Sequence, residues 1–221
     1  MRLFGIRMII GLLLFTTLHA QEVAIRNSST YIQSLPDSIL NSTMLYVSGS
    51  NSDSVLVPEI RYFTKAKRIT LIGIKHIPDY FFKLKELEEI TILHSLIDSI
   101  PDGISHLKRL KKIEILHCPV KKIPSDLQEL DSLESLILLK TCVRNIPPKI
   151  FQKSSLKTIG FCVDCLEELP YALADSKSIQ SIEMFSCCSN PRCGIKPIDT
   201  ISIRKFRNFL KEKMSPEVLI Y

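Results

Sequence analysis

The chain is poor in the residues and patterns that mark common enzyme classes. Its 221 residues include seven glycines and no tryptophan. No Gly-rich phosphate loop, HExxH or GxSxG pattern occurs, so the signatures of nucleotide-binding loops, zinc proteases and serine hydrolases are missing. Aromatic residues form 7% of the chain, and few of them accompany its cluster of basic residues between positions 108 and 122. We therefore expect neither catalysis nor a nucleic-acid partner.

Long hydrophobic runs are also scarce, and the clearest one is short and N-terminal. Segment 8–18 is predominantly apolar, follows Arg2 and Arg7, and precedes Ala20. A membrane-spanning helix needs about 20 residues, so this layout predicts a secretory signal peptide, 1–20, cleaved after Ala20. Its removal lowers the formal net charge from +6 to +4, because two arginines are lost. We expect a mature protein without a membrane span that is secreted or extracytoplasmic (periplasm or cell surface if bacterial).

What the chain has instead is an internal repeat of 23 residues. An Ile-Pro or Leu-Pro dipeptide begins at positions 77, 100, 123, 146 and 169. Three more apolar columns keep this period: Leu87, Leu110, Leu133, Leu156 and Ile179; Ile90, Ile113, Leu136, Ile159 and Ile182; and Ile92, Ile115, Leu138, Phe161 and Met184. A fixed period in the range of about 20–50 residues indicates a solenoid, in which stacked units bury a shared core.

These columns resemble the leucine-rich repeat family, in the variant with the pattern IPxxIxxLxxLxxLxL. The resemblance implies an α/β leucine-rich repeat solenoid of about seven repeats, curved, with one short parallel strand per repeat and an irregular, 3-10 convex side. It also implies recognition of other proteins. In the family, a slot after the strand usually holds Asn; here it holds Ser95, Cys118, Thr141, Asp164 and Cys187, most of which are expected to be poorer bonding partners.

Within one repeat, the residues predict a strand followed by an irregular return leg. Lys112 to Leu116 alternates polar and apolar residues across Ile113 and Ile115, which indicates a half-buried strand. Pro124 then removes a backbone donor, so the return leg is expected to form turns or short 3-10 segments. We divide the chain into the signal peptide (1–20), an N-terminal cap with a degenerate repeat (21–57), the repeats (58–190) and a C-terminal cap (191–221).

The C-terminal cap contains an amphipathic helix. Asp199 or Thr200 is expected to cap its N-terminus. Its apolar side is formed by Ile203, Phe206, Leu210 and Met214. We predict that this helix covers the core of the last repeat; binding of a membrane or a partner by a basic amphipathic helix is the alternative.

The strand pattern also predicts an exposed apolar column on the concave face of the sheet. The residue after the last inward aliphatic of each strand is Ile72, Leu93, Leu116, Leu139, Cys162 or Phe185. An apolar ribbon with polar borders is typical of an interaction surface. The alternative is that adjoining loops cover the column and it widens the core. The predicted partner-binding residues are Ile72, Leu93, His94, Leu116, His117, Ile137, Leu139 and Phe185.

Seven cysteines in a chain predicted to be exported indicate disulfides. Cys142, Cys165 and Cys188 are 23 residues apart, so Cys142–Cys165 and Cys165–Cys188 are competing predictions. The remaining member of the trio has Cys162, Cys187 or Cys193 as a candidate partner, and Cys118 is expected to be a free buried thiol. A zinc site built on Cys162 and Cys165 with Cys187, Cys188 or Cys193 is the alternative.

Together these patterns predict an exported leucine-rich repeat protein that binds a protein partner through its concave face. We expect no enzyme activity, no catalytic residue, no cofactor and no bound metal. Two other functions remain open from the sequence. One is a thiol-active or metal-binding protein that uses the Cys-rich final repeats, and the other is a structural or adhesive envelope protein.

Overall fold

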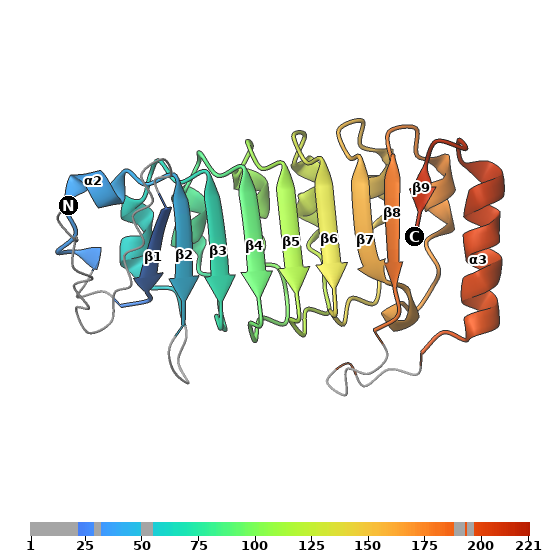
Figure 1. Cartoon of the computed structure of the whole chain (residues 1–221), viewed down its shortest axis with the longest axis horizontal. Helices are drawn as coiled ribbons and strands as arrows, with labels where there is room; N and C mark the ends of the chain where they lie inside the picture. The colour runs from blue at the N-terminus through green and yellow to red at the C-terminus, as the bar shows by residue number, and fades with distance from the viewer. Residues whose placement is uncertain (1–21, 29–31, 50–54, 188–192, 194–196) are drawn as a thin grey trace, which may run out of the picture.

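The described part of the computed structural model, residues 22–28, 32–49, 55–187, 193 and 197–221, contains one sheet of nine parallel strands. The strands follow each other in chain order from one end of the sheet to the other (Figure 1). They are β1 (Glu22–Arg26), β2 (Met44–Ser48), β3 (Arg68–Ile72), β4 (Glu89–Leu93), β5 (Lys112–Leu116), β6 (Ser135–Leu139), β7 (Thr158–Cys162), β8 (Ser181–Phe185) and β9 (Leu219–Ile220). The predicted signal peptide lies outside the described residues.

The 23-residue period of the sequence sets the register of the sheet. Ile113 of β5 pairs with Ile90 of β4 and Leu136 of β6, so each position of the repeat stacks on its equivalent in the next turn. The predicted strand from Lys112 to Leu116 is confirmed as β5, with Ile113 and Ile115 buried. Side chains alternate between the two faces of a strand, so one face builds the core and the other is open.

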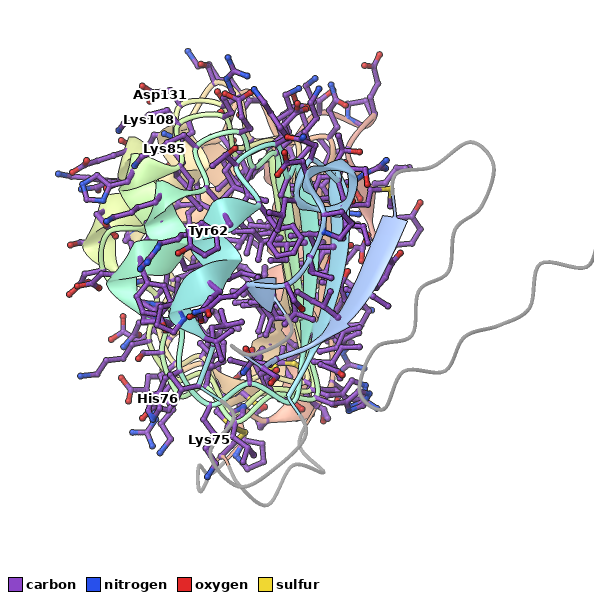
Figure 2. All side chains as sticks on the ribbon, turned by 90° about the vertical axis from the view of Figure 1, so that its left-hand side faces the viewer. Tyr62, Lys75, His76, Lys85, Lys108 and Asp131 are labelled. Atoms are coloured by element: carbon purple, nitrogen blue, oxygen red, sulfur yellow. A yellow bond between two sulfur atoms is a disulfide. The ribbon has the colours of Figure 1, made fainter. Side chains whose placement is uncertain are left out.

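Short 3-10 segments cover the core side of the sheet, as predicted. They are η1 (Pro58–Tyr62), η2 (Asp79–Lys83), η3 (Ile104–His106), η4 (Ser125–Glu129), η5 (Pro148–Gln152) and η7 (Tyr171–Asp175); a further segment, η6 (Val163–Cys165), directly follows the end of β7. A view along the stack shows Tyr62 of η1 on this side, away from the strands (Figure 2). The repeated prolines Pro78, Pro124, Pro147 and Pro170 directly precede η2, η4, η5 and η7.

The slot that follows each strand is buried and hydrogen-bonded despite its lack of Asn. Ser95 Oγ accepts from the backbone N–H of Ile74 at 3.1 Å and donates to the Leu93 carbonyl at 2.9 Å. Asp164 accepts from the backbone N–H of Cys187 at 2.8 Å and from Ser186 Oγ at 2.9 Å. Ser95 and Asp164 therefore do what the family's Asn does, because each bonds the backbone of a neighbouring turn. The expectation of poor bonding is wrong at these two positions.

The N-terminal cap is more regular than predicted. Leu45 and Val47, which lie in the predicted degenerate repeat, are buried in β2. The strand β1, which the sequence does not predict, pairs with β2 from Glu22↔Met44 to Arg26↔Ser48. A four-residue helix, α2 (Asp37–Leu40), lies between these strands in the chain. The sheet therefore extends into the predicted cap.

The predicted C-terminal helix is confirmed as α3 (Thr200–Lys213). Asp199 is its N-cap, and its Oδ1 accepts from the backbone N–H of Ser202 at 2.9 Å. Phe206 and Leu210 are buried, and the Phe206 ring meets Tyr171 of η7 edge-on at 5.1 Å. The apolar side of α3 is thus occupied by the chain's own last turn. After α3, the chain returns to the sheet as β9, which pairs with the first two residues of β8.

Candidate functional site

A line of apolar side chains crosses the open face of the sheet near the C-terminal ends of the strands. Register places Ile72 beside Leu93, Leu93 beside Leu116, and Leu116 beside Leu139. Ile72 is 37% exposed, and the three leucines are half-buried. Phe185, at the equivalent position of β8, is also half-buried. We call Ile72, Leu93, Leu116, Leu139 and Phe185 the apolar strip.

Two predicted members of this face are buried instead of exposed. Cys162, in the same column on β7, is 3% exposed because its sulfur is bonded to Cys187. Ile137, in the column nearer the middle of the strands, is 9% exposed. Its Cδ1 lies only 2.9 Å from where a Cβ on Gly160 would be, so the side chain leans over the glycine of the next strand. Ile137 therefore offers little area to a partner, contrary to its prediction as a contact residue.

The two predicted histidines lie together at the border of the strip. His94 and His117 directly follow β4 and β5, and their ring centroids are 4.6 Å apart. Both side chains are exposed, as is that of Lys140 after β6. Partial burial lowers the pKa of His117, and the charges of Lys140 and His94 lower it further. Lys140 shares the column of the histidines but is not among the predicted partner-binding residues.

The backbone at this border is unusual. The φ angles of His94, His117 and Lys140 are 44°, 58° and 53°, in the left-handed region that side chains with a Cβ rarely adopt. The equivalent residue after β3 is Gly73, with a φ of 69°. The N–H groups of His94 and His117 continue the sheet by donating to the carbonyls of Leu116 and Leu139, at 3.1 and 3.0 Å. The turns after β4, β5 and β6 therefore place one polar side chain each at the border of the strip.

Two disulfides gather beside the C-terminal part of the strip. Cys142 is bonded to Cys193, with a Cα–Cα distance of 5.0 Å, and Cys162 to Cys187, with 5.5 Å. Leu139 and Phe185 of the strip pack against this cysteine cluster. Of the two competing pairings, Cys142–Cys165 is therefore wrong, because Cys142 is bonded to Cys193. Cys165 is buried, while Cys188 lies outside the described residues.

Comparison with solved structures finds the same architecture elsewhere. The leucine-rich repeat domain of the type III effector XopL is 21% identical over 67% of this chain and 53% of its own, with a TM-score of 0.57. The Leptospira interrogans leucine-rich repeat protein LIC12759 is 16% identical, covering 75% and 54% of the two chains, with a TM-score of 0.51. TLR13, solved in a complex with ssRNA13, is 16% identical, covering 65% and 21%, with a TM-score of 0.54.

The chain has the leucine-rich repeat fold. It spans about half the length of the first two of these structures and about a fifth of the third. No protein-family model matches the sequence, and no curated protein matches it. The predicted leucine-rich repeat solenoid with parallel strands, 3-10 turns and a C-terminal helix is confirmed. Leucine-rich repeat domains generally serve as binding modules, and the fold is typically non-catalytic.

Cys118, which lies outside the cysteine cluster, does not resemble a reactive thiol. Cys118 is free and 0% exposed, as predicted. Burial raises the pKa of its thiol, although hydrogen bonding to Ser95 and to the backbone of Leu116 opposes the shift. A nucleophilic or redox-active cysteine requires the thiolate, so Cys118 is suited to packing. Among the described residues, no group of three or more His, Cys, Asp or Glu side chains is placed to hold a metal ion.

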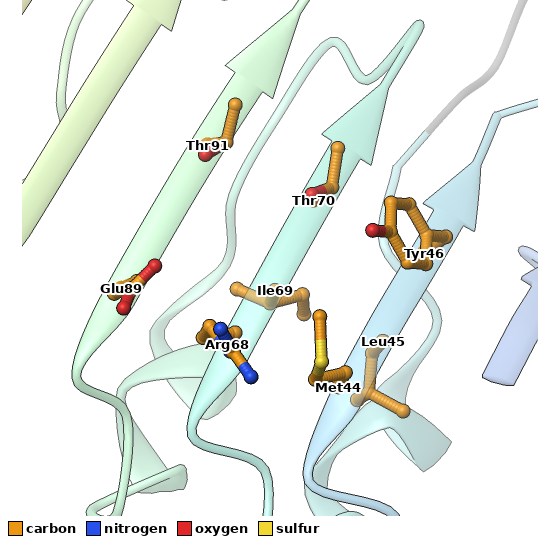
Figure 3. A pocket seen from close by; sticks show the side chains of 8 residues that line it. All are labelled: Met44, Leu45, Tyr46, Arg68, Ile69, Thr70, Glu89 and Thr91. Atoms are coloured by element: carbon orange, nitrogen blue, oxygen red, sulfur yellow. The ribbon is translucent and has the colours of Figure 1, made fainter. Parts of the chain in front are cut away.

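The structure adds a hollow that the sequence analysis missed. A depression of about 190 Å³ lies on the open face of β2, β3 and β4 (Figure 3). Its lining includes the exposed side chains of Tyr46 and Arg68 together with Thr70, Glu89 and Thr91. Arg68 and Glu89 occupy the first position of their strands, so the outward periodicity could have indicated both. No described helix has the length and apolar character needed to cross a membrane.

Proposed function

We propose that this chain is an exported, non-catalytic leucine-rich repeat protein that binds a protein partner through the open face of its sheet. The observation that supports this most directly is the apolar strip, which continues across neighbouring strands while remaining partly exposed. Apolar area that runs across a surface between polar borders is characteristic of interfaces. The predicted contacts are Ile72, Leu93, His94, Leu116, His117, Leu139 and Phe185; Ile137 is left out because it is buried.

A surface built from side chains on many successive strands suits a macromolecular partner better than a small ligand. Small-molecule sites are usually concave and bury most of the ligand. Strip residues from β3 to β8 instead lie in a line, with the polar depression beside Tyr46 and Arg68 at one end and the disulfides at the other. A protein segment that runs across the strands would contact the whole line.

Export is part of the proposal and has two supports. The first 20 residues have the layout of a signal peptide. The two disulfides fit an oxidising compartment, since cytosolic thiols are kept reduced. We propose the boundaries 1–20 for the signal, 21–57 for the N-terminal cap, 58–190 for the repeats and 191–221 for the C-terminal cap. N-terminal sequencing of the exported protein is expected to begin at Gln21.

The test replaces two strip residues by charged ones. Leu116→Asp with Leu139→Asp is expected to abolish capture of partners from the extracellular and envelope fractions of the source cells. Both side chains are already half-exposed, so the variant is expected to keep the circular dichroism spectrum and cooperative melting of the unmodified protein. Identical capture by the folded variant would contradict the proposal. Unfolding of the variant would instead show that these leucines belong to the core.

A matched control places the same new charges elsewhere. Tyr62, 43% exposed on η1, and Ile201, 55% exposed on α3, are apolar surface residues away from the open face. Tyr62→Asp with Ile201→Asp is expected to leave capture unchanged. Loss of capture in both double variants would indicate a general effect of charge and would not support the strip.

A further inference from the structure

The border of the apolar strip carries a row of cationic or ionisable groups. His94, His117 and Lys140 each directly follow a strip residue, namely Leu93, Leu116 and Leu139. All three side chains are exposed, and the centroids of the two imidazole rings lie 4.6 Å apart with the rings tilted by 34°. None of the ion pairs found among the described residues includes any of them. We call these three residues the basic row.

The two charged neighbours that act on the pKa of His117 are both basic. After partial burial, the causes of the lowered pKa of His117 are Lys140 on one side and His94 on the other. An acidic neighbour would act in the opposite direction and favour the imidazolium. The row is therefore a place where positive charge repels positive charge, and an incoming carboxylate would relieve that repulsion.

The backbone gives a second, independent reason to regard the row as a site. Left-handed φ angles are unfavourable for residues with a Cβ, and Gly73 occupies the same position one turn earlier. Strained conformations of this kind persist where the surrounding structure imposes them, and they cluster at binding sites. Three successive turns carry a His or Lys side chain at a position where glycine would be less strained. The backbone conformation alone would favour glycine at these positions. A binding role would explain why they carry polar side chains instead.

Building on the proposed function, we propose that the basic row and the apolar strip together bind an acidic segment of a protein partner. An extended chain presents alternate side chains to opposite sides. A segment that alternates carboxylates with apolar residues and lies across the strands would direct its carboxylates toward the basic row and its apolar groups toward the apolar strip. Electrostatic matching of this sort contributes specificity.

The same face argues against a uniform polyanion such as nucleic acid or a sulfated glycan. Glu89, Glu114 and Glu183 all project from it, and Glu114 is partly neutralised by Lys112 at 2.8 Å. A polyanion would have to lie near these carboxylates, whereas an acidic peptide can place its apolar side chains over the strip. The row also has only three members, which is short for phosphate-backbone binding.

The experiment uses the mature protein with three labelled decapeptides, in which leucine alternates with glutamate, glutamine or lysine. Binding is measured by fluorescence anisotropy at pH 7.5 and 5.5. We expect the glutamate peptide to bind about tenfold more tightly than the glutamine peptide, because three exposed charge pairs each contribute modestly. The preference is expected to grow as the pH is lowered to 5.5, because protonation of His117 adds positive charge to the row while glutamate remains largely ionised; the lowered pKa of His117 places this gain toward the acidic end of the range.

The decisive variant is His94→Gly with His117→Gly and Lys140→Gly, which removes the charges and suits the left-handed backbone. It is expected to lose the preference for glutamate and its pH dependence while retaining the melting temperature. Lys108→Gln, a change of one exposed lysine on the turn side of the molecule (Figure 2), is the control and is expected to keep both. If the triple variant unfolds, His94→Gln with His117→Gln and Lys140→Gln is measured in its place.

Several outcomes would overturn the inference. They are equal affinity for the glutamate and glutamine peptides, no binding of any peptide, a preference that survives in the triple variant, and tighter binding of heparin or single-stranded DNA than of the glutamate peptide. If the Leu116 and Leu139 variant loses the captured partner while the triple glycine variant keeps it, the proposed function stands and the acidic segment does not.

Discussion

The side chain of Ile137 lies over the backbone of Gly160 on the neighbouring strand, where a Cβ would come within 2.9 Å of Ile137 Cδ1. This contact fills a position of the open face that every other described strand from β2 to β8 occupies with a larger side chain. It also buries Ile137, which would otherwise belong to the exposed apolar surface. The absence of one side chain on β7 thus changes the role of another on β6.

Replacement of Gly160 by alanine is expected to be close to neutral for stability. The contacting atom is the flexible end of Ile137, which can rotate away, and alanine is favoured over glycine within a strand by about 0.5–1 kcal/mol. Urea denaturation of Gly160→Ala, Ile137→Val and the double variant measures the coupling. The double variant is expected to be at least as stable as the sum of the single changes predicts. A large independent loss in Gly160→Ala would show that the backbone itself cannot adjust.

Breaking the Cys142–Cys193 bond is expected to destabilise the protein by about 2–5 kcal/mol, because the unfolded chain regains the freedom of a long loop. Cys142→Ala with Cys193→Ala, compared with the unmodified protein in urea, measures this loss. Peptide mapping without reduction is expected to find Cys142–Cys193 and Cys162–Cys187. A Cys142–Cys165 peptide would contradict the pairing of Cys142 with Cys193.

Glycine and alanine at position 117 are expected to give proteins of different stability. Both replacements remove the imidazole, but alanine keeps the Cβ that makes a φ of 58° unfavourable. His117→Gly should therefore exceed His117→Ala in unfolding free energy by about 1–2 kcal/mol. Thermal and urea melts of the two variants give the comparison. Equal stability would mean that the turn after β5 relaxes to a negative φ.

Acid is expected to weaken the folded state slightly through His117. The folded protein lowers the pKa of this imidazole, so the unfolded chain binds the proton more readily. The stabilising contribution is complete above the usual histidine pKa of about 6.5 and is lost as the pH falls through the lower folded pKa. The melting temperature between pH 8 and 5 should fall less for His117→Gln than for the unmodified protein. An equal fall of the melting temperature in both proteins would assign the effect of acid to other groups.

The C-terminal helix is expected to be essential for stability. Phe206 is 0% exposed between α3 and the last turn, so Phe206→Ala should cost about 3–5 kcal/mol. Ile201→Ala, on the exposed side of the same helix, is the control and should change stability by less than about 0.5 kcal/mol. Urea titrations followed by circular dichroism compare the two. Similar small effects would mean that the repeats fold without their cap.

Much of the candidate surface could be predicted because one period controls it. Once Ile113 and Ile115 are assigned to the core, alternation assigns Leu116 to the open face, and the 23-residue period repeats the assignment at Leu93 and Leu139. His94 and His117 directly follow Leu93 and Leu116, so the same period places them at equivalent positions of adjacent strands. Arg68 and Tyr46 were missed as parts of a depression, since hollowing depends on how side chains from three strands lean.

The sequence by itself determined the solenoid, its strands and its core, because a local 23-residue pattern can bury its apolar side only by stacking in register. It also narrowed the helix start to Asp199 or Thr200, because capping depends on bonds within a single turn, and Asp199 is the N-cap. Only the tertiary structure decided which cysteines pair, that Ile137 is buried, and that β1 and β9 extend the sheet. These outcomes depend on loop paths and on contacts between residues of different strands, and a repeating local pattern does not contain that information.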